Sequence, residues 1–247
     1  MDPRIRRRRI EVRRDEGRRR LRLLVAVLLI LTFSVGGWVA VRSPLLDVDR
    51  VQVEGADHTV VSAIVREAAV RGGQAMIDVD EGGAARRVET LPWVAHAQVR
   101  RHWPSTVRIS VTERRVVAVT RVDGGGWALL DATARVLEVV ANPPGGITVE
   151  GVGPTAPAGG EVSGAKGPLA VVTALSPQLA ARTSAVVAIE GGQIELKLNP
   201  RGTVRLGPPV DLKTKLSAVE TVLARVDTRN LATLDVRLPS SPVLTRG

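Results

Sequence analysis

Two histidines, two serines and a nearby carboxylate are the first residues in this sequence whose types could support catalysis. They are His96, His102, Ser105, Ser110 and Glu113. Histidine titrates near neutral pH, and nucleophilic catalysis needs a hydroxyl beside a base that a third group orients. The chemistry that this group would support is hydrolysis through a serine nucleophile.

The spacing of these residues does not assemble a catalytic site. In an alternating strand over 94–101, His96 shares a face with Gln98, whereas Ser105 lies at the bend that follows. The chain has no G-x-S-x-G and no H-E-x-x-H motif, and the glycines 124–126 lack the Lys-Ser/Thr that completes a phosphate-binding loop. We therefore expect no enzyme and no catalytic residue, with a membrane-anchored hydrolase as the alternative to test.

The element that carries these residues is predicted to be a β-hairpin over 91–114. A Trp103-Pro104 pair marks its bend, because proline is tolerated where no ladder N–H is needed. Trp93 is expected to be a core anchor rather than a ligand contact, in a domain without Tyr or Phe. Three apolar residues alternate with polar ones and are expected to be buried against the preceding helices: Val107, Ile109 and Val111.

The composition excludes several kinds of site. The 247 residues include three His and no Cys, which excludes disulfides, thiolate metal sites and thiol nucleophiles. With no visible cluster of histidines and carboxylates, we expect neither a metal site nor a cofactor. The formal net charge is +10, but residues 1–22 hold 11 Arg against four acids, so the rest of the chain is nearly balanced. The charge therefore belongs to the N-terminal tail.

The segment 23–41 contains 19 residues without a charge. As a helix it would span about 28 Å, close to the roughly 30 Å hydrocarbon core of a bilayer. Gly36 and Gly37 are compatible with a membrane helix, and Trp38 lies where indole prefers the interface. A cleaved signal peptide is the alternative, but its apolar region is usually only about 7 to 15 residues long. We predict an uncleaved transmembrane helix.

The arginine-rich tail is interpreted as the topology signal of this helix. Its residues nearest the span are Arg18, Arg19, Arg20 and Arg22. Basic residues remain cytoplasmic, so the N terminus is expected inside and the main domains outside. The tail is also expected to meet anionic membrane lipid. A DNA-binding arm is disfavoured because no folded module supports it, so no nucleic-acid partner is expected.

The first part outside the membrane is predicted to have the order strand, helix, helix, strand, strand. The first strand covers 48–53, and Gly55 ends it. A helix over 59–69 would place Val60, Val61, Ile64, Val65, Ala68 and Ala69 on one face. Residues 76–80 are expected to be extended, and Asp80 to cap a second helix over 81–90. The hairpin completes this unit.

From Val116 onward the pattern changes to short strands with two further helices. The strands are expected at 116–121, 127–130, 136–139, 147–149, 186–189, 194–198, 203–206 and 234–238. One helix is expected over 169–179, opened by Pro168 and stopped near Pro177. The other runs from Asp211, its expected N-cap, to about 227, with Leu212, Leu216, Val219, Leu223 and Val226 in a stripe.

These elements predict an α+β fold with one N-terminal transmembrane helix. The expected divisions are a basic cytoplasmic tail at 1–22, the helix at 23–41, a tether at 42–47, a first domain at 48–115, a mainly β domain at 116–238 and a C-terminal tail at 239–247. The strand at 233–238 is expected to be a free edge, since nothing later in the sequence need cover it.

Several motifs resemble those of the bacterial cell-division family FtsQ, also called DivIB. They are Val51-Gln52-Val53-Glu54-Gly55, Gly73 through Asp80, Leu91-Pro92-Trp93-Val94, Trp103-Pro104, Glu113-Arg114, Gly202 through Gly207 and Leu234-Asp235-Val236-Arg237. Val116 departs from the family, which often has proline there. The resemblance covers most of the chain and is densest over 48–118. It implies that the first outer domain is a POTRA domain.

The resemblance also implies a function in septum formation. The family's C-terminal strand receives a small bitopic partner, FtsB or DivIC, in complex with FtsL, and the family links early division proteins to the septal transpeptidase and glycosyltransferase complex. Location at the midcell septum follows from the same resemblance. By position it assigns partner contacts to Leu234, Val236, Leu238, Ser240 and Val243. The alternative reading is that Leu234, Val236 and Leu238 face the core, and a POTRA-type chaperone for envelope proteins is the alternative function.

Overall fold

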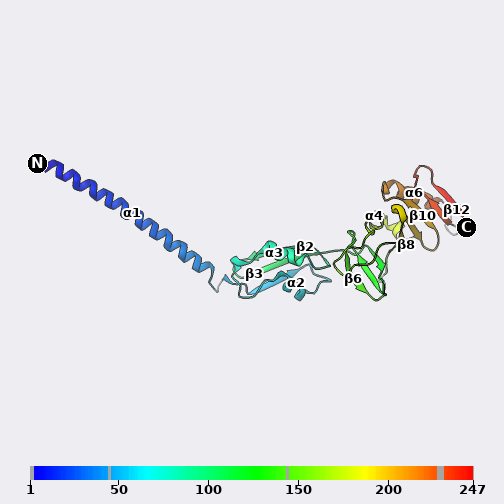
Figure 1. The fold of residues 1–247 in the computed structure, drawn as a ribbon, viewed down its shortest axis with the longest axis horizontal. Coiled ribbons are helices and arrows are strands. Elements are labelled where there is room, and N and C mark those ends of the chain that lie inside the picture. The colour runs from blue at the N-terminus through cyan, green and yellow to red at the C-terminus, as the bar shows by residue number, and fades with distance from the viewer. Residues whose placement is uncertain (1–2, 44–45, 143–144, 227–230, 247) are drawn as a thin grey trace.

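The N-terminal helix projects away from two sheet-containing units that follow it along the long axis of the molecule (Figure 1). The computed structural model describes residues 3–43, 46–142, 145–226 and 231–246. Helix α1 (Pro3–Val41) contains a segment, Arg20–Val39, that is long and apolar enough to cross a bilayer and is not buried by the rest of the chain. This agrees with a single-pass membrane protein.

The first unit has the predicted order of strand, helix, helix, strand, strand. Its elements are β1 (Arg50–Glu54), α2 (Val61–Ala68), the 3₁₀ turn η2 (Met76–Asp78), α3 (Glu81–Val88), β2 (Val94–His102) and β3 (Thr106–Glu113). Strand β3 lies in the centre of the sheet, with β1 parallel on one side and β2 antiparallel on the other. Residues Val51 and Val107 are paired across the β1–β3 ladder.

The core of this unit lies between the sheet and its two helices. Val107, Ile109 and Val111 are buried as predicted, against a cluster that includes Ile64 and Val88. Strand β3 is therefore half-buried: every second side chain is packed in the core, and the side chains between them lie on the other face of the sheet.

Three local predictions for this unit were wrong. Val60 and Val61 are exposed, because the helix starts only at Val61 and its buried face begins at Ile64. Ala69 does not extend it, since Ala69 takes φ 53° at the C-cap. Residues 76–78 form a 3₁₀ turn rather than an extended segment. The Asp80 cap is confirmed, since its Oδ1 accepts from Gly83 N at 2.9 Å.

The second, β-rich unit contains a nine-stranded mixed sheet. Its strands are β4 (Ala118–Arg121), β5 (Trp127–Leu130), β6 (Val136–Val140), β7 (Thr148–Glu150), β8 (Thr183–Ile189), β9 (Gln193–Leu198), β10 (Thr203–Gly207), β11 (Leu231–Asp235) and β12 (Val243–Arg246). Their order in space is β12-β11-β10-β9-β8-β7-β4-β5-β6. A short 3₁₀ turn, η3 (Glu190–Gly192), joins β8 to β9.

Three helices accompany this sheet: α4 (Lys166–Ala174), α5 (Pro177–Ala180) and α6 (Leu212–Arg225). The helix predicted over 169–179 is divided near Pro177, where its stop was expected, into α4 and α5. Its start was placed too late, since α4 begins before Pro168 because proline is tolerated in a helix's first turn. Asp211 precedes α6 as predicted but makes no side-chain cap hydrogen bond, since its backbone takes φ 52°.

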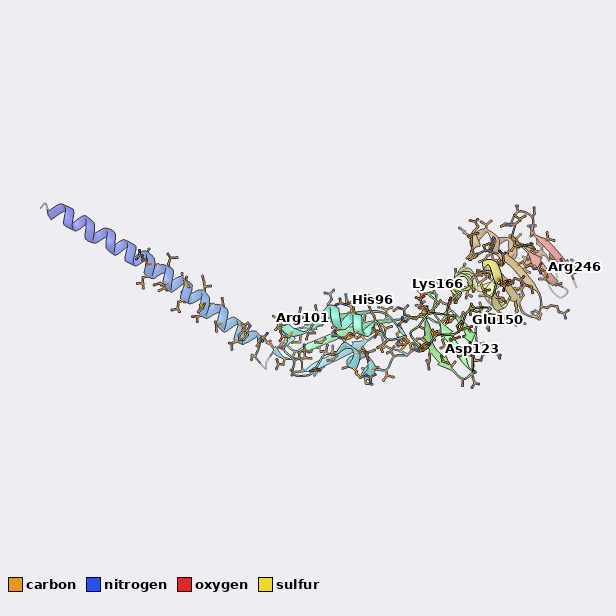
Figure 2. The ribbon with its side chains drawn as sticks, viewed as in Figure 1. His96, Arg101, Asp123, Glu150, Lys166 and Arg246 are labelled. Carbon is orange, nitrogen blue, oxygen red and sulfur yellow. The ribbon has the colours of Figure 1, made fainter. Side chains whose placement is uncertain are left out.

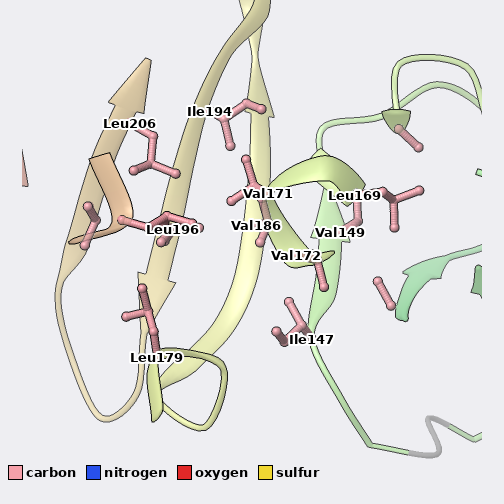
Figure 3. Close-up of a cluster of buried hydrophobic side chains, with 14 of the residues drawn as sticks. Ile147, Val149, Leu169, Val171, Val172, Leu179, Val186, Ile194, Leu196 and Leu206 are labelled. Carbon is pink, nitrogen blue, oxygen red and sulfur yellow. The ribbon is translucent and has the colours of Figure 1, made fainter. Parts of the chain in front are cut away.

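The sheet and these helices enclose one apolar core. Figure 3 shows Val171 of α4 beside Val186 of β8 and Val172 on the side of Ile147, with Leu196 and Leu206 continuing the cluster across the next strands. The stripe of α6 is confirmed for Leu216, Val219 and Leu223, which are buried, while Leu212 and Val226 are only partly so. Branched aliphatic side chains thus fill a core that contains no aromatic residue.

The two units meet through a small cluster of their own. Trp93 is partly buried against Val119, Leu129 and Leu137 of the second unit. It was expected in the core of the first unit, and this prediction was wrong because Trp93 stands where the chain turns into β2, at the end facing the second unit. It therefore joins the two sheets rather than filling one of them.

Polar contacts reinforce this junction. Arg114 donates from Nη1 to Asp131 Oδ2 at 2.8 Å and from Nε to Val94 O at 3.1 Å. Arg135 Nη2 donates to Thr90 O at 3.0 Å. Both arginines therefore bridge the first unit and the second.

Candidate interaction site at the end of the large sheet

The residues that first suggested catalysis are not brought together. His96 Nδ1 lies 2.8 Å from Glu89 Oε1 on the surface, and His102 is exposed. Neither serine of the hairpin has a hydrogen bond to a histidine among the described residues. Across those same residues, no group of three or more His, Cys, Asp or Glu could hold a metal ion. The hairpin offers no assembled nucleophile and base.

Glu113 has a structural role, because its carboxylate holds the loop at His58 and Thr59. Its carboxylate accepts from the backbone N–H of His58 at 2.9 Å and of Thr59 at 2.7 Å. The His58 ring lies 2.9 Å from the same carboxylate and stacks on Trp93 with ring centroids 4.4 Å apart. Partial desolvation opposes ionisation, but these hydrogen bonds outweigh it and hold the pKa of Glu113 at about 2. The carboxylate fastens the loop before α2 to the end of β3.

The most accessible strand edge is that of β12. It pairs antiparallel with β11, with Asp235 opposite Val243 and Leu234 opposite Leu244. No other described strand pairs with its outer side, because β12 is the last strand of the sheet order. An unpaired edge presents a row of N–H and C=O groups to which another strand can add. Figure 2 shows Arg246, the last residue of β12, at the end of the molecule farthest from α1.

The sequence placed this free edge on the wrong strand. The strand expected at 234–238 is β11 (Leu231–Asp235), which is covered on one side by β10 and on the other by β12. The covering strand lies within 239–247, the segment expected to be a tail. Residues 243–246 read Val-Leu-Thr-Arg and show no alternation, and four residues after a Ser-Pro turn are too few to identify a strand by pattern.

The five predicted contact residues divide into two groups. Leu234 and Val236 are buried in the core, as the alternative reading had it, so their side chains are not on the surface. Leu238 is 70% exposed, Val243 is 62% exposed, and Ser240 is exposed. The exposed three lie in the turn after β11 and at the start of β12.

A groove of about 400 Å³ accompanies this edge. It is lined by Asp235, Arg237, Leu238, Ser241 and Val243. Arg237 Nη2 donates to Asp235 Oδ2 at 2.6 Å, and this contact lowers the pKa of Asp235 and raises that of Arg237. The groove therefore combines two exposed apolar side chains with an ion pair at the point where β12 begins.

The other sheet edges are less available. The outer edge of β2 is capped, because Ala97 N donates to Glu89 Oε1 at 3.0 Å and Arg101 N to Glu81 Oε1 at 2.7 Å. Carboxylates in these places occupy donors that an added strand would need. At β1 the two ends, Arg50 and Glu54, are exposed charged residues, which disfavour strand addition.

The far edge of the large sheet, β6, is partly covered by its own loop. Val136 N donates to Gly160 O, and Gly159 N donates to Val136 O, both at 2.8 Å. Only the second half of β6 is left for a partner. Among the edges described, β12 is thus the one with a single charged residue, Arg246 at its end, and with no side chain or loop hydrogen-bonded along its outer side.

Comparison with known proteins shows what this chain is similar to. A family model described as a POTRA domain, FtsQ-type, matches residues 46–114. The chain is 27% identical over 205 residues to the cell division protein FtsQ of Corynebacterium glutamicum, in an alignment that covers 81% of this chain and 88% of that protein. The chain is therefore similar to FtsQ proteins over most of its length.

Other FtsQ proteins align at similar or shorter length. The one from Mycobacteroides abscessus is 28% identical over 226 residues, which is 91% of this chain and 70% of that protein. The one from Rhodothermus marinus is 40% identical over 131 residues, but this covers only 52% of the chain and 45% of the relative. The first unit is therefore a POTRA domain of the FtsQ type, and the second is the β-rich region that follows it.

Proposed function

We propose that the chain is a single-pass scaffold of the cell-division machinery that binds partner proteins by strand addition to β12. The observation that carries the proposal is the unobstructed outer edge of β12 beside a groove with exposed Leu238 and Val243. A partner strand would complete the ladder with its backbone, and its side chains would contact these apolar groups. The partners are small bitopic division proteins of the FtsB/DivIC and FtsL type.

The proposed topology places both sheets outside the cytoplasm. Arg20 and Arg22 flank the apolar part of α1, and the side chains of Arg18 and Arg19 lie outside those that the structure describes. Arginines beside a membrane span favour the cytoplasm, so the N terminus is inside. The scaffold then links early division proteins to septal peptidoglycan synthesis at the midcell septum.

The proposed scaffold is not an enzyme. Two observations support this part of the proposal. No histidine of the hairpin is hydrogen-bonded to one of its serines among the described residues, and the first unit matches a POTRA family model rather than a catalytic one. The alternative, a POTRA-type chaperone for envelope proteins, predicts a uniform envelope distribution rather than midcell bands. Imaging of a fluorescent fusion separates the two.

The binding proposal is tested with a charged substitution at the edge. Val243→Lys places a cation beside the incoming strand, and we expect it to weaken binding of the FtsB/DivIC–FtsL complex by about tenfold or more in a pull-down with the full chain in detergent. Val139→Lys, at the partly covered β6 edge, is the matched control and should bind as the wild type does. Equal binding by both variants would contradict the proposal.

A further inference from the structure

The end of the POTRA domain nearest α1 carries two large exposed apolar side chains. Trp103 lies in the turn between β2 and β3 and is 52% exposed, and Ile77 lies in η2 and is 47% exposed. Arg101 connects their segments, since its Nη1 donates to Ile77 O at 3.2 Å and its Nε to Glu81 Oε1 at 3.3 Å. Figure 2 places Arg101 at this end of the domain.

The chain leaving α1 is fastened to the same end. Val48 N donates to Gln74 O at 2.8 Å, close to η2, and Asp49 N donates to Ser105 O at 2.9 Å, in the turn that holds Trp103. Arg42, directly after α1, lies 3.5 Å from Asp78 at the end of η2. The seven Cα–Cα steps from Val41 to Val48 can span at most about 25 Å. The two apolar side chains are therefore held close to where α1 ends.

We propose that Trp103 and Ile77 insert into the interfacial zone of the bilayer that α1 crosses, so that the POTRA domain is docked on the membrane. Indole prefers this zone because its ring is apolar and its N–H can still meet water or lipid carbonyls. The inference rests on the proposed membrane anchoring, and it goes beyond the proposed partner binding, which uses the far end of the second unit.

The partner is the interfacial zone itself rather than anionic headgroups. Arginines and carboxylates share this end, and several are already matched, as Arg42 is with Asp78 and Arg101 with Glu81. A surface of mixed charge has little net attraction for an anionic membrane. The docking should therefore be the same on zwitterionic lipid.

The chain contains no cysteine, so single cysteines report on single positions. The full chain is reconstituted in phosphatidylcholine nanodiscs with an environment-sensitive fluorophore at His102→Cys, which leaves Trp103 and Ile77 intact. Val39→Cys, in α1, reports on the anchor, and Val139→Cys, on exposed β6, reports on water. We expect the emission at 102 to shift to the blue and to be quenched by doxyl-labelled lipid, whereas that at 139 does not change.

The matched variant carries Trp103→Ser and Ile77→Ser. Both side chains are largely exposed, so circular dichroism should show an unchanged fold, while the emission at 102 should lose its blue shift and match that at 139. If the label at position 102 of the intact chain has the same emission as the label at position 139, while the label at position 39 reports lipid, the docking alone is overturned. A water-exposed label at 39 would overturn the anchoring and this inference together.

Discussion

At the scale of single residues, the buried carboxylate of Glu113 shows how a candidate for chemistry becomes part of the framework. Two backbone N–H groups and the His58 ring surround it, and its side chain is 9% exposed. Its pKa of about 2 is below the ordinary value of 4.5. A depressed carboxylate pKa means that the ionised form stabilises the fold above pH 4.5, and that this contribution is lost as the pH falls from 4.5 towards 2.

Glu113→Gln removes this charge while keeping the shape of the side chain. We expect it to lower the free energy of unfolding by about 1–2 kcal/mol at pH 7, since hydrogen bonds to a charged group contribute about that much after solvent screening. The difference from the wild type should narrow between pH 4.5 and 2. Denaturant unfolding of the full chain in detergent measures it. Glu138→Gln, an exposed carboxylate on β6, is the control, and an equal effect there would contradict the assignment.

At the scale of elements, the end of β1 lies so close to β3 that it leaves no room for a side chain at Gly55. Gly55 takes φ +80°, and a Cβ there would lie 2.2 Å from Val111 O of β3, whereas Gly73 takes φ +75° with nothing within 4 Å. Both positions strain an L residue, but only Gly55 would also push β1 away from β3. Gly55→Ala should therefore destabilise the POTRA domain by about 2 kcal/mol more than Gly73→Ala. Thermal unfolding measures the stability of the two variants, and similar losses of stability in both would refute the close approach of β1 and β3 at Gly55.

Elements with a strong local period were the ones that the sequence predicted well. The alternation of 107–111 and the stripe of Leu216, Val219 and Leu223 follow from which face is buried, and burial is periodic along the chain. The location of the free edge was missed, because strand order depends on whether the short segment 243–246 returns to pair with β11. The start of the helix predicted over 169–179 was placed too late, because proline is tolerated in a helix's first turn and α4 begins at Lys166.

At the scale of the whole molecule, no pattern in the amino-acid sequence indicated that Trp93 joins the two units. The sequence shows only that Trp93 is a large apolar residue and not which unit it packs against. The fold shows that its neighbours Val119, Leu129 and Leu137 belong to the second unit. The proposed membrane contact lies where α1 meets the first unit, and the proposed partner edge lies at the far end of the second unit (Figure 1). How rigidly this junction holds the two units therefore determines where the β12 edge stands above the bilayer.

The junction should be governed by Asp131. It is buried and accepts from Arg114 at 2.8 Å, from Thr133 N at 2.8 Å and from Arg135 N at 2.9 Å. Although burial opposes ionisation, these hydrogen bonds lower its pKa, so the carboxylate is charged at neutral pH. Asp131→Ala leaves Arg114 without its carboxylate and frees the turn that holds Arg135, a loss that costs about 3 kcal/mol or more for a buried pair.

We expect this loss to loosen the units rather than unfold them, because the main cores on either side of the junction do not include Asp131. Spin labels at Arg66→Cys in α2 and Thr214→Cys in α6 report the distance between the units in the chain without native cysteine. Their distance distribution should broaden in Asp131→Ala, with circular dichroism unchanged. Asp123→Ala, in the exposed β4–β5 turn, should leave it narrow. A distribution that stays narrow in Asp131→Ala would mean that the Trp93 cluster alone holds the two units together.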